Sequence, residues 1–67
     1  MDLKVIREEM KMTQQQLADE IGKDRSLIAK IESGATLPSV ETAKAIGNVL
    51  SFDWTIFFND VGESYSH

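Results

Sequence analysis

Cysteine is absent from this 67-residue sequence, so disulfides and thiolate metal sites are excluded. There is a single proline, and no apolar run approaches the roughly 18 to 20 residues that cross a bilayer. The N-terminal residues also lack the basic-then-apolar order of a signal peptide. These absences predict one small domain that makes no membrane contact and lies in the reducing cytoplasm.

Positive charge is scarce as well. Seven basic residues stand against eleven acidic ones, which gives a net charge of −4, whereas a nucleic-acid-binding protein usually carries a basic surface. Residues 1–34 hold six basic and seven acidic side chains, a net charge of −1, and residues 35–67 hold one and four, a net charge of −3. Because the acidity leans toward the second half, the composition permits nucleic-acid binding by the first half without favouring it.

Helical signals recur along the chain, and no segment alternates apolar and polar residues long enough to predict a strand. Asp2 is the expected cap of a first helix over about residues 3–10. Thr13 and Gln16 have the spacing of a capping box, in which each side chain satisfies a backbone N–H near the other. Gly22 is expected to end this second helix, because glycine tolerates the left-handed conformation common at helix ends.

Three more helices are expected in the rest of the sequence. The third lies between a predicted cap at Asp24 and a terminating glycine at Gly34. A fourth begins after Pro38 and Ser39, and its expected inner face consists of Val40, Ala43, Ile46, Gly47 and Leu50. Asp53 predicts the start of a short last helix, so the fold class is all-α.

Two short helices joined by a tight glycine turn form the pattern of a helix-turn-helix. Ile28 and Ile31 are expected to hold the helix after the turn against its neighbour, so that its opposite face can enter a DNA major groove. The residues on that face are Arg25, Ser26, Ala29 and Lys30, with Leu27 at its edge. Arginine can read guanine bidentately, serine can bond to several bases, and leucine can pack on a thymine methyl. Lys23 and Lys30 can neutralise phosphates.

The stretch from Leu17 to Gly34 (LADEIGKDRSLIAKIESG), followed by Pro38-Ser39, resembles the Cro/repressor-type (Xre family) helix-turn-helix domain. The flanks Ile6-Arg7-Glu8 and Leu50-Ser-Phe-Asp-Trp54 agree as well, so the resemblance covers residues 3 to about 58. It implies a five-helix, lambda-repressor-like domain over residues 1–58, with double-stranded DNA as the partner. Residues 59–67 are small and polar, so a flexible tail is expected there.

The resemblance also implies roles for individual residues. Gln14 matches the start of the second helix, where the family commonly holds a phosphate. The positions that usually meet base edges are matched by Arg25, Ser26 and Leu27, and Lys30, one turn on, matches a base or phosphate contact. Arg7 and Glu32 match a family ion pair that ties the first helix to the recognition helix. If that pair is partly buried, its loss from one side should cost on the order of 3 kcal/mol or more.

Departures from the family pattern bear on affinity. Lys23 stands where the family usually has a small apolar residue, and Ala29 and Ser33 replace residues that are often polar or basic. Fewer phosphate contacts predict weak, salt-sensitive binding by one subunit, so that dimerisation or a second module would be required. The last helix carries four large apolar residues in five positions, too many for one small core. The expected dimer contacts among them are Trp54, Phe57 and Phe58.

These observations favour a sequence-specific transcription regulator, a repressor that occupies an operator as a homodimer. No catalytic constellation, cofactor motif or metal-ligand set is recognisable in the sequence, so an enzyme is not expected. Two alternatives stay open. A protein-interaction module of the same fold, such as an antirepressor, would suit the acidic balance and the apolar last helix. An antitoxin would combine DNA binding with a toxin partner.

Overall fold

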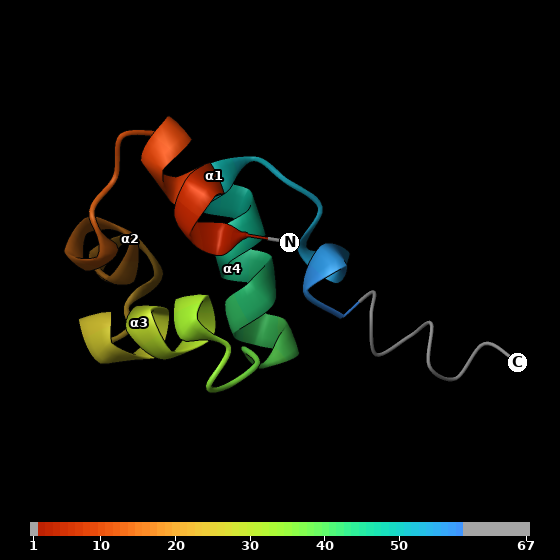
Figure 1. The fold of residues 1–67 in the computed structure, drawn as a ribbon. Helices are drawn as coiled ribbons and strands as arrows, with labels where there is room; N and C mark the ends of the chain where they lie inside the picture. The colour runs from red at the N-terminus through yellow and green to blue at the C-terminus, as the bar shows by residue number, and fades with distance from the viewer. Residues whose placement is uncertain (1, 59–67) are drawn as a thin grey trace, which may run out of the picture.

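The computed structural model describes residues 2–58, in which there are four α-helices and no strand (Figure 1). The helices are α1 (Leu3–Glu9), α2 (Gln14–Ile21), α3 (Arg25–Ser33) and α4 (Val40–Leu50), followed by the 3₁₀ helix η1 (Trp54–Phe58). The all-helical class is therefore confirmed. None of the helices within residues 2–58 has the length and apolar character to cross a membrane. The polar tail expected over residues 59–67 lies outside the described residues.

Local capping signals set the limits of α1 and α2. Asp2 accepts a hydrogen bond from Val5 N at 3.3 Å, as expected for the cap of α1. Both hydrogen bonds of the Thr13–Gln16 capping box are present, at 2.8 and 3.0 Å. After α1, Lys11 turns the chain with a φ of 59°, in the left-handed region that disfavours residues with a Cβ. This strained position is one that the sequence does not reveal.

The cap expected at the start of α3 is only partly present. Asp24 occupies the N-cap position in an extended conformation, but its side chain makes no capping hydrogen bond. Its carboxylate is exposed to water instead. The predicted start of the helix is therefore right, and the predicted capping hydrogen bond is wrong. Gly34 ends α3 with a φ of 83°, the left-handed conformation expected of it.

The fifth helix expected from the sequence is not an α-helix. Residues 54–58 form a short 3₁₀ helix, in which Ile56 N donates to the Asp53 carbonyl three residues back, at 3.1 Å. Asp53 does cap it, because its side chain accepts from Thr55 N at 3.0 Å. A segment of five residues is too short for α-helical bonding to propagate, and single turns commonly adopt the tighter 3₁₀ form. The described chain therefore contains four α-helices rather than five.

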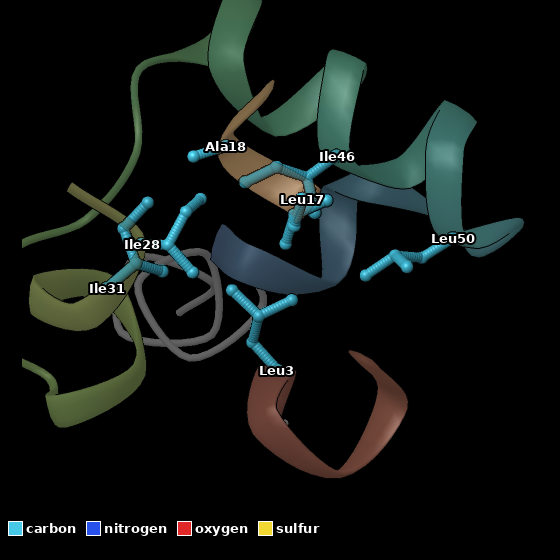
Figure 2. Packing of buried hydrophobic residues seen from close by; sticks show 7 residues of the cluster. All are labelled: Leu3, Leu17, Ala18, Ile28, Ile31, Ile46 and Leu50. Carbon is cyan, nitrogen blue, oxygen red and sulfur yellow. The ribbon is translucent and has the colours of Figure 1, made fainter. Parts of the chain in front are cut away.

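The core lies where all four α-helices meet (Figure 2). Its buried apolar residues come from every α-helix and point toward one centre: Leu3, Leu17, Ala18, Ile28, Ile31, Ile46 and Leu50. Leu17, Ile28 and Ile46 are fully buried, and Phe57 of η1 packs against the cluster from outside. This shared core fixes the angle between α2 and α3, on which any helix-turn-helix function depends.

Helix α4 differs from its expected inner face at one residue. Val40 is 51% exposed because it lies in the first turn, at the edge of the buried face, while Thr42 is buried in its place. Gly47 has a clear steric role, since a Cβ there would stand 2.8 Å from the Phe52 carbonyl oxygen and 3.0 Å from the Trp54 Cβ. The glycine allows the chain after α4 to fold back closely and to bring η1 against the helix.

Candidate nucleic-acid interface

The helix-turn-helix consists of α2, the turn at residues 22–24, and α3, which pack against each other (Figure 1). Gly22 adopts a φ of 71°, and Lys23 N donates to the Ala18 carbonyl at 2.9 Å, which closes the turn. Ala18 is fully buried where the two helices approach, and a larger side chain would separate them. The turn geometry expected from the sequence is present.

The outward face of α3 carries the predicted base-reading residues. Arg25, Ser26 and Lys30 are all exposed, whereas Ile28 and Ile31 on the opposite face are buried in the core. Lys23, just before the helix, is exposed as well. The spacing of apolar residues in the sequence is enough to separate these two faces, because positions three and four apart share one side of a helix.

Leu27 and Ala29 occupy intermediate positions at the borders of this face. Both are half-buried, and Leu27 packs against the core cluster. Part of the Leu27 side chain is therefore engaged within the protein, and only its remaining surface can meet a thymine methyl. The structure brings Leu27 to the edge of the face.

A polar network fixes α3 to α1 and α2. Arg7 Nε donates to Glu32 Oε2 at 2.6 Å, and Arg7 Nη2 donates to Oε1 at 3.3 Å. The two side chains are only 8% and 6% exposed. Arg7 Nη1 also donates to the Met12 carbonyl at 2.6 Å, and Gln14 Nε2 donates to Glu32 Oε1 at 3.0 Å. One buried carboxylate thus links three segments, and no buried side-chain polar atom in the described part of the chain lacks a partner.

The titration of this pair follows from its surroundings. Burial by itself would raise the pKa of Glu32, but hydrogen bonds from Arg7 and Gln14 and the charges of Arg7 and Lys4 outweigh it and lower the pKa. The hydrogen bond to Glu32 raises the pKa of Arg7, although burial opposes it. Both groups are therefore held in their charged forms, and the ion pair persists at neutral pH.

Gln14 has a different environment from the one that the family resemblance suggests. It is half-buried, and its amide holds Glu32, so its side chain supports the position of α3. An amide nitrogen has two hydrogens, so one donor remains for a phosphate. No local sequence pattern indicates the Gln14–Glu32 contact, because the residues are 18 positions apart and belong to different helices.

An open groove of about 420 Å³ adjoins the first turn of α3, between the end of α1 and the start of α2. Three cationic residues line it: Arg7, which is paired with Glu32, Lys11 from the α1–α2 turn, and Arg25 from α3. The acidic Glu8 lines it as well. Gln14 and Gln15 line it from α2. Sequence reasoning missed Lys11 as a neighbour of this face, since only the path of the turn brings it there.

The residues expected at a dimer contact lie on η1. Trp54, Phe57 and Phe58 are all half-buried, and their rings meet edge-on in pairs, with centroids 6.2 Å apart for Trp54–Phe58 and 6.5 Å for Phe57–Phe58. Lys44 Nζ lies 5.3 Å from the centroid of the Trp54 ring. Each ring thus packs partly against its own chain and is partly exposed to solvent.

Comparison with known families agrees with this geometry. The model of a family described as Helix-turn-helix matches residues 3–57, which includes all four α-helices and η1 except its last residue. The chain therefore belongs to the Cro/repressor-type helix-turn-helix family.

A bacterial relative bears on function. The chain is 43% identical over 65 residues to the uncharacterized HTH-type transcriptional regulator YqaF of Bacillus subtilis (strain 168), a match that covers 97% of this chain and 86% of the relative. No solved structure shows a significant match to this chain.

Proposed function

We propose that this protein is a sequence-specific double-stranded DNA-binding transcription regulator, and that it acts as a repressor by occupying an operator as a homodimer. Membership of the helix-turn-helix family and the name of the Bacillus subtilis relative support a DNA-binding regulator. The observation that carries the proposal is the two-sided character of α3. Ile28 and Ile31 anchor the helix in the core, while Arg25, Ser26 and Lys30 are exposed on the other side.

In this proposal each outward residue has a chemical task. The planar guanidinium of Arg25 donates two hydrogen bonds to O6 and N7 of a guanine, and the Ser26 hydroxyl bonds to a neighbouring base. Leu27 contacts a thymine methyl with the part of its side chain that is not engaged with the core. Lys23, Lys30 and the free amide hydrogen of Gln14 contact phosphates, which fix the register of the helix without reading sequence.

The small number of cations explains why two copies are needed. Lys23 and Lys30 supply two phosphate contacts per copy, or four per dimer, so the logarithm of affinity should fall with the logarithm of salt with a slope of about −4. This is a modest electrostatic contribution, and the exposed Asp19, Glu20 and Asp24 nearby oppose it. A symmetric dimer that reads two half-sites one DNA turn apart doubles the base contacts.

Selection from random-sequence duplexes tests the proposal, followed by affinity measurement on the enriched site. Wild-type protein should enrich a motif with two-fold symmetry. Arg25→Ala should weaken binding by about 5- to 150-fold and relax the preference at one position in each half-site. Lys44→Ala, which removes an exposed cation from α4 instead, is the matched control and should bind like wild type. Failure of folded protein to enrich any motif at low salt would contradict sequence-specific binding.

A second candidate is a protein-interaction module of the same fold, an antirepressor or an antitoxin. The observation that favours it is the net charge of −4. The double variant Arg25→Ala/Lys30→Ala separates the candidates, because both side chains are exposed and their removal should leave the melting temperature unchanged. Loss of regulation in cells would support DNA binding, and full activity would support a protein partner. For an antitoxin, a toxin should co-purify with the tagged chain.

A further inference from the structure

Lys11, in the turn between α1 and α2, has a backbone conformation that favours glycine. Its φ of 59° lies in the left-handed region, where a Cβ is sterically disfavoured. The side chain is exposed, and among residues 2–58 it makes no ion pair. The turn itself is closed by the backbone, since Lys11 N donates to the Glu8 carbonyl at 2.9 Å. Contacts within the described part of the chain therefore do not explain why a lysine stands at this position.

Positive charge gathers at the groove that Lys11 and Arg25 line, which we call the Lys11 groove. A third cation on its lining, Arg7, is neutralised by its pairing with Glu32. Lys11 and Arg25 together carry +2 and Glu8 carries −1, so the remaining charge of the lining is +1, whereas the whole chain carries −4. The Lys11 groove therefore favours an anion, against the sign of the protein as a whole.

Uncharged residues of the Lys11 groove offer hydrogen-bond donors. Thr13 Oγ1 accepts a hydrogen bond from Gln16 N at 3.0 Å, so its own hydroxyl hydrogen can still be donated. Gln14 Nε2 uses one of its two hydrogens on Glu32, which leaves the second. A phosphodiester carries one negative charge and only acceptor oxygens. A cation with donors beside it matches that chemistry, and hydrogen bonds to a charged acceptor are the stronger kind.

The presence of Arg25 on the same lining identifies the source of the phosphate. In the proposed function Arg25 reaches a base edge in the DNA major groove, which is about 12 Å wide. An α-helix is itself about 10–12 Å across, so α3 would fill the major groove, and residues beside α3 would face the phosphates at its edges. Lys11 belongs to a different element from Arg25 but lines the same hollow, so it is one of these residues.

We propose that the Lys11 groove binds a phosphate of the DNA backbone, and that the Lys11 ammonium group is the charged contact to it. Thr13 and Gln14 donate hydrogen bonds at the same place. This inference rests on the proposed function and adds a third cationic contact per copy to those of Lys23 and Lys30. A dimer then makes six such contacts instead of four, so the slope of log affinity against log salt steepens from about −4 to about −5.

Binding to the selected duplex over a salt series tests the contact, with Lys11→Gly as the main variant. Glycine removes the ammonium group and suits the left-handed turn, so the variant should melt at a higher temperature than wild type. It should nevertheless bind DNA about 3- to 10-fold more weakly for each bound copy at about 0.1 M salt. The salt slope should become less steep by about 1 for each copy. The selected motif should stay the same, because a phosphate contact reads no sequence.

Further variants separate charge from backbone effects. Lys11→Ala keeps a Cβ in the left-handed turn, so it should bind as weakly as Lys11→Gly without the higher melting temperature. Lys11→Arg keeps the charge and should keep the wild-type slope. Glu8→Gln removes the exposed acidic residue from the Lys11 groove and should strengthen binding. Lys44→Ala, which removes an exposed cation from α4, is the matched control and should keep both affinity and slope.

Neutral methylphosphonate linkages, placed one at a time in the selected duplex, locate the phosphate. Wild type should lose affinity at several linkages, and one of these losses in each half-site should be absent in Lys11→Gly. A Lys11→Gly chain with the affinity and slope of wild type, or with the same losses at every linkage, would overturn the role of Lys11 and leave sequence-specific DNA binding standing. A folded wild-type chain that enriches no motif would overturn the proposed function, and this contact with it.

Discussion

Arg7→Met is the substitution that most severely tests how α3 is held. Methionine preserves much of the length of the side chain. The Glu32 side chain, which is only 6% exposed, is then left with Gln14 as its one hydrogen-bond donor among the described residues. The Met12 carbonyl loses its donor as well. Removing one partner of a buried ion pair costs about 3–5 kcal/mol. A chain of this length has a total stability of about 3–10 kcal/mol, so the variant should lose a large part of it.

The double variant Arg7→Met/Glu32→Met shows whether the loss comes from the uncompensated charge. Replacing both partners by apolar residues of similar volume is often neutral, so most of the stability should return. Urea denaturation at neutral pH, followed by helical circular dichroism and by the fluorescence of Trp54, gives both free energies of unfolding. A loss below about 1 kcal/mol in Arg7→Met, a value typical of surface ion pairs, would show that the pair does not hold α3 in place. So would a double variant no more stable than the single one.

The pH dependence of stability, compared between Arg7→Met and wild type, gives a further test. In Arg7→Met, burial should raise the pKa of Glu32, so protonation relieves the buried charge and the variant should become more stable as the pH falls toward 4. In wild type the folded pKa lies below the ordinary value of 4.5. The contribution of Glu32 is therefore fully present above about pH 4.5 and is lost as the pH falls through the folded pKa. The two proteins should respond to acid in opposite directions.

Three further outcomes follow from the structure. Glu32→Gln should reduce the loss of stability that wild type shows below about pH 4.5. Urea midpoints over a pH series measure this, and an unchanged pH dependence would mean that Glu32 is not the responsible group. Gly47→Ala should destabilise by about 1–3 kcal/mol despite its better helix propensity, because the backbone oxygen of Phe52 cannot move aside, and the emission of Trp54 should shift to the red. Asn48→Ala, at the exposed neighbouring position of the same helix, is its control and should be neutral or slightly stabilising; equal stability of the two variants would contradict the steric role. Ser51→Gly should raise stability by about 0.5–1 kcal/mol in thermal melts, because Ser51 has a φ of 61°, and Asn48→Gly, within the helix, should lower it by a similar amount.

Local signals in the sequence were sufficient for most element boundaries. The Thr13–Gln16 capping box and the glycines at positions 22 and 34 each act within one helical turn, so their residue types specify the geometry directly. The separation of Ile28 from Ser26 follows from helical periodicity in the same way. Positions that depend on tertiary context were not predictable. Neither Lys11 nor Ser51 is a residue that indicates a left-handed turn, yet both adopt one.

The same division applies to the candidate interface. Which residues of α3 face outward could be derived from spacing alone, because the buried isoleucines define the opposite side. The contact from Gln14 to Glu32 and the position of Lys11 at the groove that Arg25 also lines depend on how α1, α2 and α3 pack together, which no local pattern encodes. The exposure of Val40 was missed because helical periodicity does not indicate where neighbouring elements stop covering a face.

Contact between DNA and the outward face of α3 can be measured by mapping backbone amide chemical shifts during titration with the selected duplex. We expect the largest changes on the amides of Arg25, Ser26 and Lys30 and at the start of α2. Changes concentrated instead around Leu37 and η1, with the α3 amides unmoved, would contradict it.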